Sequence, residues 1–155
     1  MLRRLTEAGV DFVVIGGIAV IAQGYGRATR DLDIALADDA ANLEALGNAL
    51  VAMEGRLRGV DDDVPFVPDA RTLAGVQLLT LDTSLGWLDV HRRVPGVKSY
   101  EDLRAHAKRT TITGVPVLVA SIDDLLAMKE AAGRDQDRVD IAALRAIKRR
   151  GGGPG

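Results

Sequence analysis

Cysteine is absent from this chain of 155 residues, and histidine occurs only at His91 and His106. The lack of cysteine excludes disulfide bonds and thiolate metal sites, and it fits a cytoplasmic protein. Two histidines are too few for an ordinary zinc site. Aromatic residues make up only 3% of the chain, so we expect a core of valine, leucine, isoleucine and alanine.

Excess charge and long apolar runs are also missing. The net charge is −2, with 20 basic and 22 acidic residues, unlike the basic excess of a nucleic-acid coat protein. No apolar run could cross a bilayer and no signal peptide is recognisable, so we expect no membrane partner. Hydrophobic residues make up 47% of the chain. We therefore expect a single folded domain over residues 1–150 and a disordered glycine-rich tail over residues 151–155.

Apolar periodicity and capping residues predict a chain of mixed helices and strands. We expect strands over residues 11–15, 30–36, 76–82, 87–91, 109–112 and 115–120. We expect helices over residues 2–8, 18–23, 39–53, 99–107, 121–132 and 135–149. Residues 55–69 contain Asp61-Asp62-Asp63 and two prolines, which favour a solvated acidic loop over a metal site. The predicted fold class is α/β (α+β), with a mixed central sheet, helices packed mainly on one side and C-terminal helices.

Two carboxylates separated by one leucine stand in the predicted strand over residues 30–36. Asp31 and Asp33 point the same way in an extended strand, and the leucine between them points the other way. Paired carboxylates repel each other unless a cation lies between them, and Mg²⁺ prefers such oxygens. Upstream, Gly16-Gly17 ends a strand and opens a helix, where free backbone N–H groups can bind phosphate. This stretch predicts a phosphate-binding turn beside a metal pair.

A further carboxylate, Asp89, stands between apolar residues in the strand over 87–91. Burying it alone would cost several kcal/mol, so a buried Asp89 requires a partner. The alternative is an outward-facing aspartate on a half-exposed strand. His91 shares the face of Asp89, where a plain polar strand end is the simpler interpretation. We expect Trp87 in the core rather than as a stacking platform.

Together, Gly16-Gly17 and Arg27-x-Thr29-x-Asp31-Leu32-Asp33-Ile34 resemble the motif of the nucleotidyltransferase superfamily that includes DNA polymerase beta. Within it, the chain is most similar to small bacterial nucleotidyltransferase toxin-like proteins of abortive-infection and toxin–antitoxin systems. The resemblance runs from about Val10 to about Leu144. Many members carry Gly-Ser in place of the glycine pair, so this chain lacks one hydroxyl that would contact phosphate.

The resemblance implies an enzyme that transfers a nucleoside monophosphate from an NTP to an acceptor hydroxyl. Asp31, Asp33 and Asp89 would be the catalytic residues and would hold the metal, with two Mg²⁺ ions expected and Mn²⁺ as a substitute. The nucleotide would be bound by the matching motif residues Gly16, Gly17, Arg27 and Thr29.

The segment over residues 121–144 resembles the closing helices of the same family. In related proteins its basic residues approach the nucleotide, which implies a nucleotide-binding role for Lys129. The alternative for Lys129 is a surface ion pair with Asp137 or Asp140, and Arg134 fits that alternative better.

The acceptor stays open at this point: RNA such as tRNA, a protein, or a small molecule such as an aminoglycoside. The toxin-like resemblance implies a cognate toxin or antitoxin as a partner. A non-catalytic nucleotide- or partner-binding domain of the same fold is the main alternative to an enzyme. A generic α/β domain with structural acids is a third reading, disfavoured because it leaves three strand carboxylates without a cation.

Overall fold

The structure is a computed structural model that describes residues 1–61 and 64–151. Its elements in chain order are α1 (Leu2–Glu7), β1 (Phe12–Ile15), α2 (Gly16–Ala22), β2 (Asp31–Leu36), α3 (Ala40–Ala52), β3 (Arg56–Leu57), α4 (Ala70–Ala74), β4 (Leu78–Thr83), β5 (Gly86–His91), α5 (Tyr100–His106), β6 (Lys108–Ile112), β7 (Val115–Val119), α6 (Ile122–Ala132) and α7 (Asp135–Arg149). No helix in this described part of the chain is long and apolar enough to span a membrane.

All the strands join one seven-stranded sheet in the order β3-β4-β5-β2-β1-β7-β6. The hairpins β4–β5 and β6–β7 and the pair β1–β2 are antiparallel, while β2–β5 and β1–β7 are parallel. The mixed central sheet that the sequence predicts is therefore confirmed. Strands β2 and β1 lie at its centre, so the Asp31–Asp33 motif sits in the middle of the sheet.

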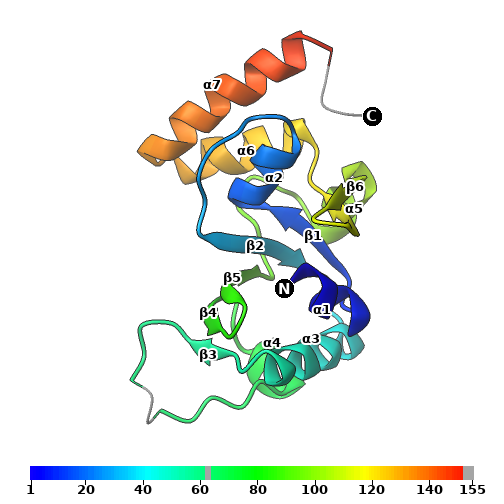
Figure 1. Ribbon diagram of the computed structural model, residues 1–155, viewed down its shortest axis with the longest axis vertical. Coiled ribbons are helices and arrows are strands. Elements are labelled where there is room, and N and C mark those ends of the chain that lie inside the picture. The colour runs from blue at the N-terminus through cyan, green and yellow to red at the C-terminus, as the bar shows by residue number, and fades with distance from the viewer. Residues whose placement is uncertain (62–63, 152–155) are drawn as a thin grey trace.

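Two groups of helices flank this sheet (Figure 1). Helices α1, α3 and α4 lie on one side of it, where α3 buries Leu43, Leu46 and Leu50 at helical spacing. Helices α2, α6 and α7 lie on the other side (Figure 1). The odd-numbered side chains of β2 and β5 face this second group, and the even-numbered ones, such as Ile34, are buried in the core.

The C-terminal helix pair has the start and stop signals that the sequence shows. The Ser121 hydroxyl accepts the backbone N–H of Asp124 and so caps α6. Gly133 ends α6 with φ +65°, a conformation that favours glycine, and α7 follows almost at once. The predicted C-terminal helices are confirmed, and α6 and α7 pack against each other beside α2.

One expected loop contains a strand. Arg56 and Leu57 pair with Asp82 and Leu81 and form β3 at the edge of the sheet. Two residues give no periodic signal, so only the pairing with β4 could reveal this strand. Of the acidic run, Asp61 is exposed, whereas Asp62 and Asp63 lie outside the described residues. The predicted tail also lies outside them beyond residue 151.

Candidate active site

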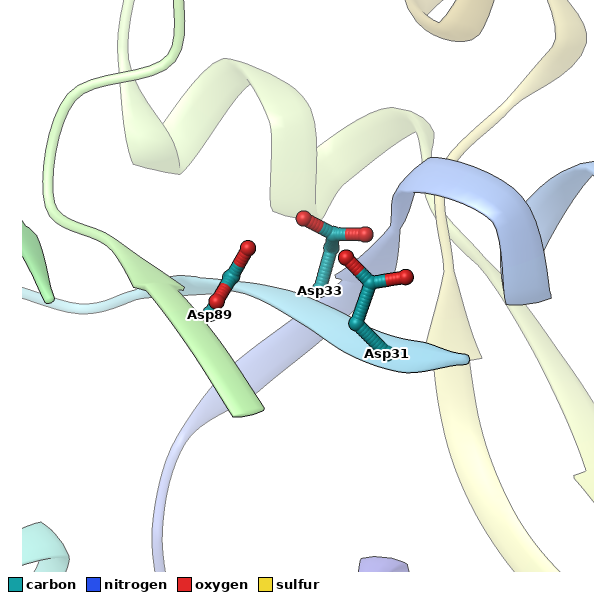
Figure 2. A group of neighbouring side chains, drawn as sticks. All are labelled: Asp31, Asp33 and Asp89. Carbon is teal, nitrogen blue, oxygen red and sulfur yellow. The ribbon is translucent and has the colours of Figure 1, made fainter. Parts of the chain in front are cut away.

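Three carboxylates meet on one face of the sheet. Asp31 and Asp33 project from β2, and Asp89 projects from β5 beside them (Figure 2). The parallel register pairs Asp33 with Asp89, so the two side chains leave adjacent strands at the same level. One oxygen from each carboxylate lies within 4.8 Å of the others. All three side chains are half-buried, and oxygen donors of this number and spacing fit a hard divalent cation.

The carboxylate of Asp89 has a cationic neighbour on its outer side. The guanidinium of Arg58, which follows β3, forms an ion pair with Asp89 Oδ1. Burial raises the pKa of Asp89, the Arg58 charge opposes that shift, and the nearby Asp33 and Asp31 charges raise the pKa further. The net direction is upward, so Asp89 holds a proton more readily than an isolated aspartate does.

The two carboxylates of β2 also have polar neighbours. The Thr29 hydroxyl donates to Asp31 Oδ1 over 3.2 Å. His91 Nε2 lies 3.2 Å from Asp33 Oδ1, which confirms that His91 shares the carboxylate face. These contacts hold the two carboxylates while leaving oxygens for a ligand, since each carboxylate has about four lone-pair positions.

The glycine pair lies against this cluster because it lacks side chains. Gly16 has φ +63°, and a Cβ atom there would lie 2.3 Å from Asp33 Oδ2. A Cβ atom on Gly17 would lie 2.6 Å from Thr29 Oγ1 and 2.9 Å from the Arg27 guanidinium. The pair thus allows the start of α2 to approach the carboxylates, and helix α2 begins at Gly16 rather than at residue 18.

A buried ion-pair network stands behind the glycine pair. Lys129 Nζ lies 2.9 Å from Asp137 Oδ1 and 2.7 Å from Asp140 Oδ2. Arg27 approaches the same Asp140, with Nε 3.0 Å from Oδ1. Both aspartates and Lys129 are buried, so this is an interior network rather than the surface ion pair considered as the alternative.

Arg134 is the exposed cation of this region. Its Nε donates to Asp137 Oδ2 over 2.8 Å, while 75% of its side chain is exposed. Burial would raise the pKa of Asp137, but hydrogen bonds from Arg134 and Lys129 lower it to about 2. The pKa of Arg134 is raised chiefly by its bond to Asp137, and the Asp33 and Asp31 charges add to this effect. The pKa of Arg134 is therefore raised in part by the carboxylates of Asp33 and Asp31, which line the same pocket.

All the sequence-predicted site residues line one pocket of about 410 Å³. Its walls contain Gly16, Gly17, Arg27, Thr29, Asp31, Asp33, Asp89, Lys129 and Arg134. The lining thus combines carboxylates from β2 and β5 with cations from the loop before β2 and from the C-terminal helices. A triphosphate with its metal ion needs both kinds of charge.

Sequence reasoning misplaced one residue of this region and missed another. Trp87 is 40% exposed instead of lying in the core. It stands beside Asp31 in the β2–β5 register, and the Arg58 guanidinium lies 4.9 Å from its ring centroid. Arg58 itself gave no signal, because a single arginine in an expected loop has no pattern. Only the pairing of β3 with β4 brings it to Asp89.

No protein-family model and no curated protein matches this sequence. Solved structures do match, over most of the chain. The lincosamide antibiotic adenylyltransferase LnuA, bound to lincomycin, matches with a TM-score of 0.61 and 18% identity, covering 94% of this chain and 92% of LnuA. A nucleotidyltransferase-like antigenic protein from Paracoccidioides brasiliensis matches with a TM-score of 0.53 and 17% identity, over 94% of this chain and 71% of that one. The antibiotic-resistance factor ANT(2'')-Ia matches with a TM-score of 0.51 and 13% identity, over 96% of this chain and 91% of that one.

Structural matches at identities this low establish the fold alone, so the activity has to be argued from the residues of the site. The chain has the nucleotidyltransferase fold, as its motif led us to expect.

Proposed function

We propose that this protein is a divalent-metal-dependent nucleotidyltransferase that moves a nucleoside monophosphate from an NTP to an acceptor hydroxyl. The observation that carries the proposal is the three-carboxylate cluster, whose oxygens lie within 4.8 Å of one another. Three negative charges this close are stabilised by a cation, and oxygen donors favour Mg²⁺ or Mn²⁺. We propose Asp31, Asp33 and Asp89 as the metal ligands, with two ions as the expected number.

In this reaction the acceptor oxygen attacks the α-phosphorus and forms a new P–O bond. The bond from the α-phosphorus to the oxygen that bridges it to the β-phosphate breaks, and pyrophosphate leaves. We propose that the proton of the acceptor hydroxyl passes to Asp89, the carboxylate of the cluster that lies on β5. Divalent ions bound to the carboxylates would stabilise the charge on the attacking and leaving oxygens.

The donor nucleotide is proposed to lie between the glycine pair and the C-terminal helices. Gly16 and Gly17 line the same pocket as the carboxylates, so their backbone can approach the phosphates. Arg27 and Thr29 remain proposed nucleotide contacts, as does Lys129. The ion pairs of Lys129 and Arg27 with Asp140 already engage part of their charge. Arg134 also pairs with Asp137, but its side chain is 75% exposed and lines the same pocket, so it becomes a further candidate for the triphosphate.

The biological setting is also a proposal. LnuA, whose structure holds lincomycin, makes a small-molecule hydroxyl one candidate acceptor, beside RNA and protein. A role in a toxin–antitoxin system rests on the motif resemblance alone, as does a cognate protein partner. An NTP-consuming reaction fits a cytoplasmic location. We propose that residues 1–150 act as one domain.

The test is transfer of label from NTPs labelled at the α-phosphate, compared with NTPs labelled at the γ-phosphate. Purified protein with Mg²⁺ is offered bacterial RNA, bacterial protein and a panel of hydroxylated antibiotics. Transfer of the α-label alone, lost in Asp31→Asn/Asp33→Asn, is the expected result. Transfer of the γ-label would show phosphoryl transfer instead and would overturn the proposal.

A non-catalytic nucleotide-binding domain is the second candidate, and one observation favours it. Arg58 neutralises part of the Asp89 charge by an ion pair, which reduces the need for a metal at that carboxylate. NTP binding that depends on Asp31 and Asp33, with no transfer to any acceptor, would support this second function.

A further inference from the structure

The sheet order separates the two ends of the site. Gly16, Gly17 and Thr29 lie toward β1, on one side of the β2 carboxylates. Asp89 lies on β5, on the other side, and β4 and β3 follow beyond it. If the donor nucleotide occupies the glycine side, the acceptor hydroxyl must approach from the side of β5, β4 and β3.

That side presents an exposed aromatic ring and a cation. Trp87, the sole tryptophan of the chain, is 40% exposed and shares the face of Asp89. The Arg58 guanidinium lies over one face of the indole and also pairs with Asp89. Exposed Leu78, on the neighbouring strand, lines the same pocket as Asp89. An exposed indole beside reacting groups is a typical ligand contact.

We propose that Arg58 and Trp87 form the acceptor wall of the site and that this wall takes a nucleotide unit. This inference rests on the proposed nucleotidyltransferase function. The indole and the stacked guanidinium offer a flat surface to a base. Arg58 has five N–H donors and a guanidinium charge that attracts phosphate. The ribose hydroxyl between base and phosphate would then lie near Asp89.

The guanidinium of Arg58 disfavours a cationic group at its own position on the wall, while Asp31 and Asp82 stand beside Trp87 in the strand register. Arg58 is the cation in contact with Asp89, the proposed general base. An ammonium group of a polycationic aminoglycoside would therefore meet repulsion from the guanidinium at that point. The acid nearest in register to Trp87 on β4 is Asp82, which stands opposite Arg56 of β3. An acceptor that combines a ring with a negative charge matches this wall, and a nucleotide does so whether free or at the end of an RNA strand.

The fluorescence of Trp87 reports ligand binding at the acceptor wall without any catalytic turnover. The donor site is first filled with Mg²⁺ and α,β-methylene ATP, which cannot donate its α-phosphate. AMP, the trinucleotide ApApA, ribose 5-phosphate and tobramycin are then titrated separately. AMP or ApApA should change the fluorescence with saturation, and ribose 5-phosphate and tobramycin should not. Tighter binding of ApApA than of AMP would identify the end of an RNA strand as the acceptor. Equal binding of the two would identify a free nucleotide.

Variants locate the effect at the wall. Arg58→Ala should weaken nucleotide binding about tenfold or more, because it removes a charge-assisted phosphate contact. Arg58→Lys keeps the charge but loses the planar group that stacks on the indole, so it should give an intermediate loss of nucleotide affinity. It replaces Arg58→Ala in the test if that variant does not fold. Arg145→Ala, which removes a surface cation paired with Glu130, is the matched control and should bind like the wild type.

Wild-type affinity in a folded Arg58→Ala variant would overturn the inference, as would fluorescence changes with tobramycin alone. Failure of the proposed function is read separately, from calorimetric binding of α,β-methylene ATP. If that binding persists in Asp31→Asn/Asp33→Asn, the proposed donor site at these carboxylates is refuted, whatever the Trp87 fluorescence shows for the acceptor wall.

Discussion

Gly16→Ala tests the close approach on which the site geometry depends. Gly16 has φ +63°, where a residue with a Cβ atom costs about 1–2 kcal/mol. The added Cβ would also lie 2.3 Å from Asp33 Oδ2 and 2.6 Å from Asp33 Cγ, so the carboxylate must move. Such overpacking costs about 1–3 kcal/mol, which gives a total of about 2–5 kcal/mol.

Gly9→Ala is the matched control for this substitution. Gly9 has φ +76° and no atom within 4 Å of an added Cβ, so it carries only the backbone cost. Urea unfolding of the two variants should differ by about 1–3 kcal/mol, with Gly16→Ala the less stable. Gly16→Ala should also bind Mg²⁺ about tenfold more weakly, because Asp33 is displaced. Equal unfolding free energies with an unchanged Mg²⁺ affinity would refute the contact between Gly16 and Asp33.

Three further predictions concern the ion-pair network and the metal. Asp140→Ala should destabilise the fold by about 3–5 kcal/mol in urea unfolding, because it removes one of the two carboxylates that pair with buried Lys129 and the carboxylate that pairs with Arg27. The exposed Arg145→Ala control should cost less than about 1 kcal/mol. The pKa of Asp137 is lowered to about 2, so above pH 4 its charged form contributes about 2 kcal/mol to the free energy of unfolding. This contribution is lost as the pH falls through 2. Unfolding measured against pH should therefore show the difference in stability between the wild type and Asp137→Asn closing over that range. Mg²⁺ at one hundred times its Kd should stabilise the wild type by about 2.7 kcal/mol, and thermal unfolding of Asp31→Asn/Asp33→Asn should show no such gain.

The parts of the site that the sequence reveals are those with a local pattern. Asp31 and Asp33 share a face because strand side chains alternate, and the glycine pair marks a turn where a Cβ does not fit. The boundaries of α6 were predictable for the same reason, because Ser121 and Gly133 are local start and stop signals. Asp89 needed more, since its place opposite Asp33 follows from a parallel pairing between distant strands.

The parts that could not be predicted arise from tertiary contacts alone. Arg58 reaches Asp89 only because β3 joins the edge of the sheet, and two residues of strand give no period. Trp87 is exposed because its strand turns that face toward the site, which overrides the usual preference of tryptophan for burial. The burial of Lys129 depends on two helices folding against each other, so the sequence left a surface ion pair open as the alternative to nucleotide binding.

The most direct test of the central claim is Mn²⁺ binding followed by electron paramagnetic resonance, in which free Mn²⁺ gives a signal that bound Mn²⁺ largely loses. The wild type without nucleotide should remove free Mn²⁺ from solution with saturation, and Asp31→Asn/Asp33→Asn should leave the signal unchanged. Equal Mn²⁺ binding by the two proteins would place the metal elsewhere, and no binding by either would contradict a carboxylate metal site at Asp31, Asp33 and Asp89.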